Sequence, residues 1–212
     1  MSRFTILLGG DLEPTSALRA DVARTRVIAA DAGMLHADAL GVVPELWVGD
    51  FDSVPERLPE RLAGVPREGF PREKDKTDGE LAVDIALARG ASELLLVGAF
   101  GGRRSDHEFL HLALACRLAA DGLPTVLTSG AQEGFPLLHG RSRFDYPTGT
   151  LFSILGFSDL SGLTVTGAKW PLDAVEVPFG SSLTLSNETL GRLEIALDTG
   201  RALLLVHPQA TD

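Results

Sequence analysis

Two aspartates follow a short apolar run in the segment Leu46–Ser53, which reads Leu-Trp-Val-Gly-Asp-Phe-Asp-Ser. In extended backbone the side chains of Asp50 and Asp52 point to the same side, so that one divalent ion can bridge them. Mg²⁺ is commonly held by one or two carboxylates together with phosphate oxygens. The alternative is a polar turn in which either aspartate caps backbone amides. The spacing alone leaves both interpretations open.

A second charged segment, Pro71–Asp78, alternates basic and acidic side chains directly before a predicted helix. Free amides and the macrodipole at a helix N-terminus attract anions, so Lys74 and Lys76 beside Thr77 suit a polyphosphate. Asp78 fits the same dipole and can complete a metal site with the two aspartates of the first segment. A solvated loop with ordinary helix capping is the alternative.

A third segment, Gly98–His107, combines a glycine-rich turn with the pair Arg103-Arg104 between an apolar strand and a long helix. This combination describes a phosphate cradle. It is not a P-loop, because Gly-x-x-x-x-Gly-Lys-Ser/Thr occurs nowhere, and the dinucleotide pattern Gly-x-Gly-x-x-Gly is also missing. The common NTPase and dehydrogenase interpretations therefore lose their main support.

The residues His107–His111 match the His-Glu-x-x-His pattern of zinc peptidases. Catalytic zinc needs a third protein ligand, and none of the other histidines continues a zincin-like motif. Glu108 also has a competing use, since Ser105 and Glu108 fit a helix capping box. Zinc proteolysis therefore remains a remote alternative.

The elements that carry these segments predict an α/β fold with a mostly parallel sheet and flanking helices in the first part of the chain. Short apolar runs predict strands at Phe4–Leu8, Arg26–Ala30, Leu46–Gly49, Glu93–Gly98 and Thr125–Thr128. Amphipathic stretches predict helices at Thr15–Ala23, Met34–Leu40, Gly79–Ala88 and Asp106–Ala120. A capping box at Thr77–Glu80 marks where one of these helices starts.

After about Ser129, short alternating runs replace the helical periodicity, with a turn signal about every ten residues. We expect strands at Phe144–Tyr146, Leu151–Leu155, Leu163–Thr166, Ser182–Leu185, Leu193–Leu197 and Ala202–Val206. The pattern predicts an α/β domain over residues 1–130 and an all-β domain over residues 135–212, with a boundary within Ser129–Gly134. A smaller β extension of one core is the alternative.

Composition narrows the class of protein. The chain has 212 residues, 44% of them hydrophobic, and a net charge of -10. This charge argues against a broad binding face for nucleic acid or an anionic membrane. The single cysteine, Cys116, excludes an internal disulfide and falls in an apolar helical pattern that predicts a buried thiol. No segment approaches the roughly 20 apolar residues of a membrane span. The apolar run Phe4–Leu8 is too short for the apolar region of a signal peptide, so we expect a cytoplasmic location.

In their order along the chain, these motifs resemble those of the thiamine pyrophosphokinase family. The resemblance runs from about residue 4 to about residue 190. It rests on Ala30–Gly33, Asp50–Ser53, Lys74–Asp78, Gly101–His107, Gly167–Leu172 and Ser186–Glu188. Two positions depart from the family pattern: Ala32 stands where the family often has Gly, and His111 where it commonly has Asn.

The resemblance implies transfer of a diphosphoryl group from ATP to the hydroxyl of thiamine, which yields thiamine diphosphate and AMP. It also implies a nucleotide domain followed by a β-sandwich, with active sites between the subunits of a homodimer. By the same resemblance, Asp50, Asp52 and Asp78 would hold Mg²⁺, with Asp31 in the same acidic site. ATP would be handled by Lys74, Thr77, Arg104, Asp106 and His107. Thiamine would be contacted by Trp170, Ser186 and Asn187.

Besides the remote zinc peptidase, two other functions stay open at this point. A related diphosphokinase acting on a hydroxymethyl pterin would keep the acidic segments but have no use for a thiamine-specific tryptophan. A nucleotide sensor would bind ATP without turnover. At the level of single residues, Trp170 could stack on thiamine by a cation-π contact or simply pack in a core.

Overall fold

The computed structural model describes residues 2–51, 58–71 and 75–208. It divides into two compact units, the first comprising Met1–Phe109 with Leu127–Gly130 and the second Leu110–Val126 with Ala131–Asp212. Within the described ranges, no helix is long and apolar enough to cross a membrane.

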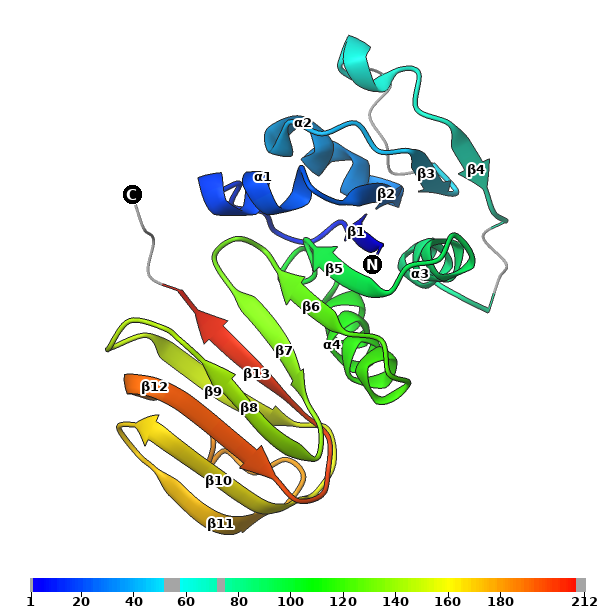
Figure 1. Ribbon diagram of the computed structural model, residues 1–212. Coiled ribbons are helices and arrows are strands. Elements are labelled where there is room, and N and C mark those ends of the chain that lie inside the picture. Colours follow the sequence, from blue (N-terminus) through cyan, green and yellow to red (C-terminus); the bar gives the residue numbers. More distant parts are fainter. Residues whose placement is uncertain (1, 52–57, 72–74, 209–212) are drawn as a thin grey trace. The chain divides into compact units, whose positions relative to one another are not determined.

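The first unit is built on a parallel sheet in the order β4-β3-β2-β1-β5 (Figure 1). These strands are β1 (Arg3–Leu7), β2 (Arg26–Ala30), β3 (Leu46–Gly49), β4 (Arg67–Gly69) and β5 (Glu93–Val97). All except β4 are almost entirely buried, as expected for a parallel sheet that is covered on both faces. The chain winds from β1 toward β4 and then returns to the other side of β1, so the strand order reverses between β1 and β5.

Helices connect these strands. In Figure 1, α1 and α2 lie on one side of the sheet and α3 lies on the other, where it packs against β1, β2 and β3. The helical segments are α1 (Ser16–Val22), η1 (Asp31–Leu35), α2 (His36–Leu40), η2 (Glu60–Leu62), α3 (Asp78–Ala88) and α4 (Ser105–Ala120). The helix predicted at Met34–Leu40 is therefore divided between a 3-10 turn and a short α-helix.

One of the two predicted capping boxes is confirmed. The Glu80 amide donates to Thr77 Oγ1 at 3.3 Å, and the Thr77 amide donates to Glu80 Oε2 at 3.2 Å. At the other site α4 already begins at Ser105, and the Arg104 carbonyl accepts from the amides of His107 and Glu108. Ser105 thus lies inside the helix instead of capping it.

The second unit contains antiparallel strands. Two groups of pairs occur: β7-β13-β9, and β8-β12-β10-β11. The strands are β7 (Glu133–Leu137), β8 (Gly140–Phe144), β9 (Leu151–Gly156), β10 (Leu160–Ala168), β11 (Leu172–Val177), β12 (Asn187–Leu197) and β13 (Ala202–His207). The remaining strand, β6 (Thr125–Thr128), is divided between the two units. At its start β12 pairs with β9, with Asn187 opposite Phe152, before it continues between β8 and β10.

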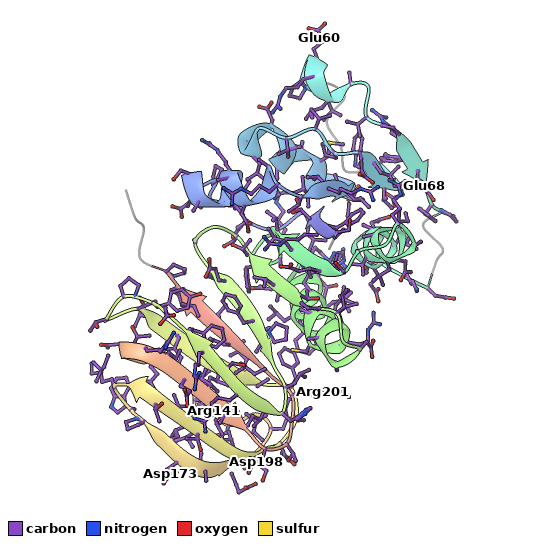
Figure 2. All side chains as sticks on the ribbon, in the orientation of Figure 1. Glu60, Glu68, Arg141, Asp173, Asp198 and Arg201 are labelled. Atoms are coloured by element: carbon purple, nitrogen blue, oxygen red, sulfur yellow. The ribbon has the colours of Figure 1, made fainter. Side chains whose placement is uncertain are left out.

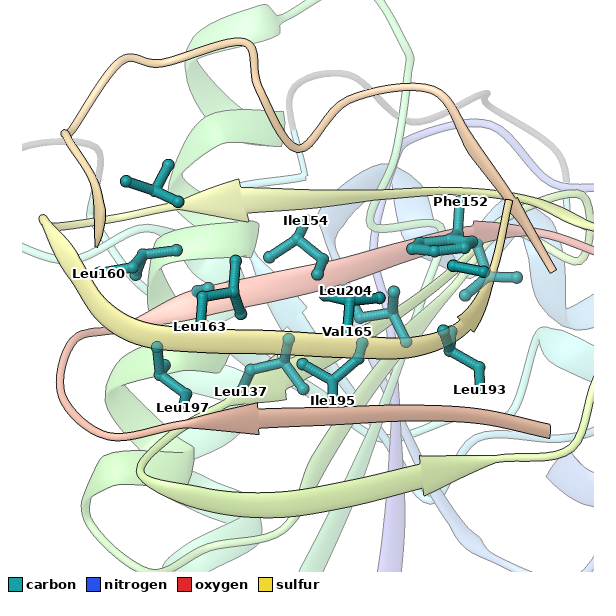
Figure 3. Packing of buried hydrophobic residues seen from close by; sticks show 14 residues of the cluster. Leu137, Phe152, Ile154, Leu160, Leu163, Val165, Leu193, Ile195, Leu197 and Leu204 are labelled. Carbon is teal, nitrogen blue, oxygen red and sulfur yellow. The ribbon is translucent and has the colours of Figure 1, made fainter. Parts of the chain in front are cut away.

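Both strand groups contribute to one apolar core (Figure 3). Phe152 and Ile154 of β9 and Leu204 of β13 come from one group, and Leu163 of β10 and Ile195 of β12 come from the other; all are nearly inaccessible to solvent. The second unit therefore buries the inward side chains of its alternating strands against each other.

Cys116 is buried in the second unit, as predicted. Its Sγ lies 3.6 Å from the Ala202 carbonyl oxygen, to which the thiol donates. Burial raises the pKa of the Cys116 thiol to about 12. The thiolate, which is the reactive form, is therefore disfavoured.

The predictions fail where strands are polar or irregular. β4 and β8 carry exposed charged residues, for example Glu68 and Arg141, and therefore have little apolar alternation (Figure 2). β11 is interrupted by Ala174, whose φ of 47° accompanies a shift in register against β10. β7 begins inside the segment that was predicted to be a boundary.

The strand predicted at Ser182–Leu185 is wrong, because this segment forms turns. Thr184 is buried there and its hydroxyl donates to the Ile154 carbonyl at 2.6 Å. The neighbouring Leu183 and Leu185 are exposed. The inward position is thus taken by the polar residue, which reverses the alternation that the prediction assumed.

Replacing Leu96 in β5 with alanine is expected to lower the free energy of unfolding by about 2–5 kcal/mol, because the side chain is 0% exposed and its removal leaves a cavity. The measurement is urea unfolding followed by circular dichroism. The matched control is Leu87→Ala in α3, where the side chain is 40% exposed and a change within about 0.5 kcal/mol is expected. Equal losses in both variants would contradict the assignment of β5 to the core.

Candidate functional site

Two of the predicted aspartates lie at the carboxyl edge of the first unit's sheet. Asp31 follows β2 directly and Asp50 follows β3 directly. Ala30 pairs with Val48, so Asp31 lies opposite Gly49. A Cβ atom at Gly49 would come within 3.2 Å of the Asp31 Cα. The turns that carry the two aspartates are therefore packed directly against each other.

The backbone of Asp31 adopts a left-handed conformation, with a φ of 43°. Residues other than glycine rarely adopt this conformation, although Asp tolerates it better than most. The indole Nε1 of Trp47 donates to the Asp31 carbonyl at 2.9 Å, and Trp47 itself is buried in β3. Trp47 therefore holds Asp31 in place. Sequence reasoning did not find this function, because a tryptophan in an apolar strand has no local feature that reveals its partner.

Phe51, between the two aspartates of the first motif, has a φ of 61°. A left-handed conformation is a genuine outlier for such a bulky residue. Its ring packs edge-on against Trp47 with the centroids 4.9 Å apart, and a Cβ atom at Gly69 would lie 3.7 Å from it. The Phe70 amide also donates to the Gly49 carbonyl at 3.2 Å. Packing thus fixes the turn that begins at Asp50.

A third group of residues lies where the strand order reverses. After β1, the Gly10 amide donates to the Gly98 carbonyl at 2.9 Å and the Asp11 amide donates to the Phe100 carbonyl at 2.7 Å. A Cβ atom at Gly10 would lie 2.3 Å from the Phe100 oxygen, so only glycine fits there. The Gly102 amide donates to Asp11 Oδ1 at 3.2 Å. Ligands of open α/β sheets bind at such a reversal.

Sequence reasoning missed the residues that follow β1. The available signal was Gly9-Gly10-Asp11 placed directly after a buried strand. It did not stand out because its partners, the residues after β5, are about ninety positions away in the chain.

His36, at the start of α2, contacts the turns that follow β1 and β5. Its Nε2 lies 2.9 Å from the Gly10 carbonyl oxygen, and it also packs against Gly98. Burial lowers the pKa of His36 below its ordinary value, and nearby carbonyls and Asp11 oppose this effect only in part. A neutral ring that donates from Nε2 fits this environment.

Thr77 and Asp78 lie at the start of α3. Only a few residues separate the end of α3 from β5, so that end lies at the amino edge of the sheet. The helix spans 11 residues and therefore rises about 16 Å, which brings its first turn to the carboxyl edge. The Thr77 hydroxyl is already used as the helix cap. Lys76 forms an ion pair with Asp84 at 2.5 Å.

Arg104 and Asp106 form a close pair at the start of α4. Arg104 Nε donates to Asp106 Oδ1 at 2.9 Å, and Arg104 Nη2 donates to Asp106 Oδ2 at 2.6 Å. The hydrogen bonds from Arg104 hold the pKa of the Asp106 carboxyl well below its usual range. Both side chains are 64% exposed, so the guanidinium keeps a face open to an anion. His107 follows on the same helix and is half-buried.

Only two of the three predicted metal ligands, Asp50 and Asp78, are among the residues that the structure describes. Among the residues that the structure describes, no three His, Cys, Asp or Glu side chains lie close enough together to hold a metal ion. Asp52 and Lys74 lie outside the described residues. The ligand set Asp50, Asp52 and Asp78 therefore stays a prediction.

The predicted thiamine-side residues come together in the second unit. Asn187 Oδ1 accepts from the Trp170 amide at 3.1 Å, and its Nδ2 donates to the Trp170 carbonyl at 2.8 Å. The Trp170 side chain is 52% exposed, so the alternative that it packs in a core is wrong. Lys169 Nζ lies 4.7 Å from the centre of its ring and 2.9 Å from Glu188 Oε1. A buried amide thus holds the backbone of an exposed aromatic residue.

Ser186 lies next to this clamp. Its φ is 58°, and its amide donates to Ser153 Oγ at 3.0 Å. The left-handed residue ends the turns of residues 183–186 and directs the chain into β12 at Asn187. Ser186 and Asn187 are therefore brought beside Trp170 although they are far from it in the sequence.

Fold and site together define the class of this chain: a mixed α/β protein with a large sheet and a polar site at the carboxyl ends of its parallel strands. The family model of the thiamin pyrophosphokinase catalytic domain matches residues 22–127, and that of the thiamin pyrophosphokinase vitamin B1 binding domain matches residues 141–204. The chain belongs to the thiamin pyrophosphokinase family.

Individual relatives agree with this assignment. The thiamine pyrophosphokinase of Bacillus subtilis (strain 168) is 29% identical over 167 residues, which cover 77% of this chain and 78% of that protein. The crystal structure of thiamine pyrophosphokinase from Bacillus subtilis matches with a TM-score of 0.85 and 25% identity over 99% of this chain and 100% of that chain. The enzyme from Geobacillus thermodenitrificans matches with a TM-score of 0.78 and 26% identity over 100% and 99%.

The family assignment confirms three predictions: the resemblance itself, thiamine diphosphokinase activity, and the enzyme class of an ATP-dependent diphosphotransferase. The pterin, sensor and zinc-peptidase alternatives give way to it. The roles of individual residues stay predictions.

The stability of the first unit is expected to fall below neutral pH because of His36. Its pKa is lower in the folded chain than its ordinary value of 6.5, so the unfolded chain binds more protons between these two values. The contribution of neutral His36 to the free energy of unfolding should therefore be complete above about pH 6.5. It should decrease as the pH falls below this value. In His36→Gln, whose amide can still donate to Gly10, this decrease should shrink. Urea unfolding at pH 7.5 and pH 5 measures it, and an unchanged difference in the variant would contradict the prediction.

Proposed function

We propose that the carboxyl edge of the first unit binds ATP and that the face around Trp170 binds thiamine, whose hydroxyl attacks the β-phosphorus of ATP. The bond from the β-phosphorus to the oxygen that it shares with the α-phosphorus breaks, AMP leaves, and the proton of the thiamine hydroxyl is released to solvent. The observation that carries the proposal is the direct packing of the Asp31 turn on the residue before Asp50. This packing gathers carboxylates from two strands at the edge where open α/β sheets bind their ligands.

The chemistry of the predicted ligands suits magnesium as the accompanying ion, although the described residues do not form a cluster of three ligands by themselves. Asp31, Asp50 and Asp78 offer carboxylate oxygens from three elements of one sheet edge, and hard oxygen ligands are those that Mg²⁺ prefers. Asp50, Asp52 and Asp78 would hold the ion, with Asp31 nearby. When bound, the ion offsets charge on the polyphosphate and on the leaving group.

On the ATP side, the chain's own contribution is positioning and charge. The exposed guanidinium of Arg104, already oriented by Asp106, would bind a phosphate oxygen, and Lys74 would neutralise charge that develops on the bridging oxygen. The start of α3 at Thr77 directs free amides toward an anion. His107 would contact the nucleotide from α4. Phosphoryl transfer needs mainly such positioning.

On the thiamine side, the exposed ring of Trp170 would stack on the cationic, aromatic vitamin. Asn187 would act through its two hydrogen bonds to the Trp170 backbone, and Ser186 through its position beside them. Asn187 is buried and both of its polar groups are used in this clamp. We therefore propose that Asn187 orients Trp170.

The finer predictions on architecture are also kept as proposals. We propose a nucleotide domain over residues 1–130 and a β-sandwich over residues 135–212, which the shared core of the two strand groups supports. A homodimer is proposed from the family resemblance, and the expected cytoplasmic location is also kept as a proposal. Neither nucleic acid nor a membrane is proposed as a partner, in keeping with the net charge of -10.

The direct test is incubation of the protein with ATP, Mg²⁺ and thiamine, followed by separation of the products. AMP and thiamine diphosphate are expected in equal amounts. Formation of ADP would show transfer of a single phosphoryl group, and AMP that forms only with a hydroxymethyl pterin would show a different acceptor. Either outcome would overturn the proposal.

Asp50→Asn is expected to lower kcat by about 100-fold or more, because it removes a charge that acts where the polyphosphate reacts. The side chain lies just beyond β3, so the far-ultraviolet circular dichroism spectrum should not change. The matched control is Asp121→Asn, at a side chain in the second unit that is 67% exposed. Turnover at the wild-type rate in Asp50→Asn would remove this residue from the proposed site.

Trp170→Ala is expected to raise the KM for thiamine about tenfold, equivalent to about 1.4 kcal/mol, and to leave the KM for ATP within about twofold. Trp170→Phe keeps an aromatic face and should give an intermediate value. Leu190→Ala, at another exposed apolar side chain of the second unit, is the matched control. The two KM values are measured by steady-state kinetics with each substrate varied in turn. Equal changes in both would contradict stacking of Trp170 on thiamine.

A further inference from the structure

We propose that Arg67 is a positioning residue whose guanidinium, stacked on Trp47 and Phe51, holds Asp31 and Asp50 in the arrangement that binds the nucleotide. This inference rests on the proposed use of those two aspartates at ATP. Arg67 belongs to none of the motifs that predicted the site, and it lies in β4, a strand that sequence patterns missed.

The contacts of Arg67 are specific. Its guanidinium carbon lies 4.6 Å from the centre of the Trp47 ring and 5.6 Å from the centre of the Phe51 ring. The two rings meet edge to face, so one cation contacts both. A planar guanidinium stacks on aromatic faces, which an ammonium group does less well.

The position of Arg67 follows from strand register. Trp47 pairs with Arg67 in the parallel β3-β4 ladder, and Gly49 pairs with Gly69. A Cβ atom at Gly69 would lie 3.7 Å from the Phe51 ring, an ordinary van der Waals distance, so the ring lies directly beside this strand. The edge strand therefore brings a long basic side chain over the end of β3, beside the turn that starts at Asp50.

Two left-handed residues depend on this stack. Trp47 donates to the carbonyl of Asp31, whose φ is 43°, and it packs on Phe51, whose φ is 61°. Such conformations persist only when the surrounding contacts enforce them. Arg67 covers the tryptophan that is common to both contacts. Removing the guanidinium is therefore expected to loosen both aspartate turns together, without removing any group that touches substrate.

The test compares Arg67→Met, which keeps a long apolar side chain, with Arg67→Lys. For Arg67→Met we expect kcat to fall about tenfold and the affinity for α,β-methylene-ATP with Mg²⁺, measured by calorimetry, to fall by a similar factor. The KM for thiamine should stay within about twofold. Arg67→Lys should recover part of both losses, because it restores the charge but not the planar stack. Arg117→Met, at an exposed arginine of α4, is the matched control and should behave as wild type.

The outcomes separate this inference from the proposed function. If Arg67→Met binds the ATP analogue and turns over like wild type, the inference is wrong. A uniform loss that also raises the KM for thiamine, or a loss that lysine does not relieve, would equally overturn it. If Arg67→Met does not fold, Arg67→Lys alone decides: wild-type values in both assays contradict the inference and a partial loss supports it. Asp50→Asn in the same assays tests the proposed function, because wild-type behaviour there removes its basis whatever Arg67 does.

Discussion

The close approach of the chain after β1 to the chain after β5 is the constraint on which the candidate site depends. The Gly10 and Asp11 amides bind the Gly98 and Phe100 carbonyls, at a distance that leaves no room for a side chain at position 10. This contact joins the turns after β1 and β5, at the point where the strand order of the sheet reverses. It also places the Asp11 carboxylate on the Gly102 amide, which shapes the turn that leads to Arg104 and α4.

Backbone strain is concentrated at the predicted site. Among the described residues, four that are not glycine have a left-handed φ: Asp31, Phe51, Ala174 and Ser186. Three of these four lie in, or next to, a predicted nucleotide or thiamine motif. Each has a contact that holds it: an indole hydrogen bond for Asp31, an edge-to-face aromatic contact for Phe51 and a serine hydroxyl for Ser186. Such strain is kept where the position of a side chain matters more than local stability. Ala174 instead accompanies the irregular register of β11.

Charge gives the site a second constraint. Carboxylates and a polyphosphate repel each other, and the whole chain carries a net charge of -10. A site built from Asp31 and Asp50 is therefore suited to ATP only together with a divalent cation and basic side chains. Arg104, exposed but oriented by Asp106, meets this need without the cost of burying an unpaired charge. The proposed cation and the proposed basic residues therefore have the same effect, because both reduce the repulsion between the carboxylates and the polyphosphate.

The sequence by itself determined the strands β2, β3 and β6, the capping box of α3 and the family, because continuous apolar runs, a local cap and ordered motifs are all encoded over neighbouring residues. It did not reveal the polar strands β4 and β8, whose pairing depends on neighbours in the sheet. Only the tertiary structure decided that Trp47 holds Asp31 and that Asn187 holds Trp170. Each of these contacts joins residues sixteen or more positions apart, and the side chains carry no local pattern until the strands bring them together.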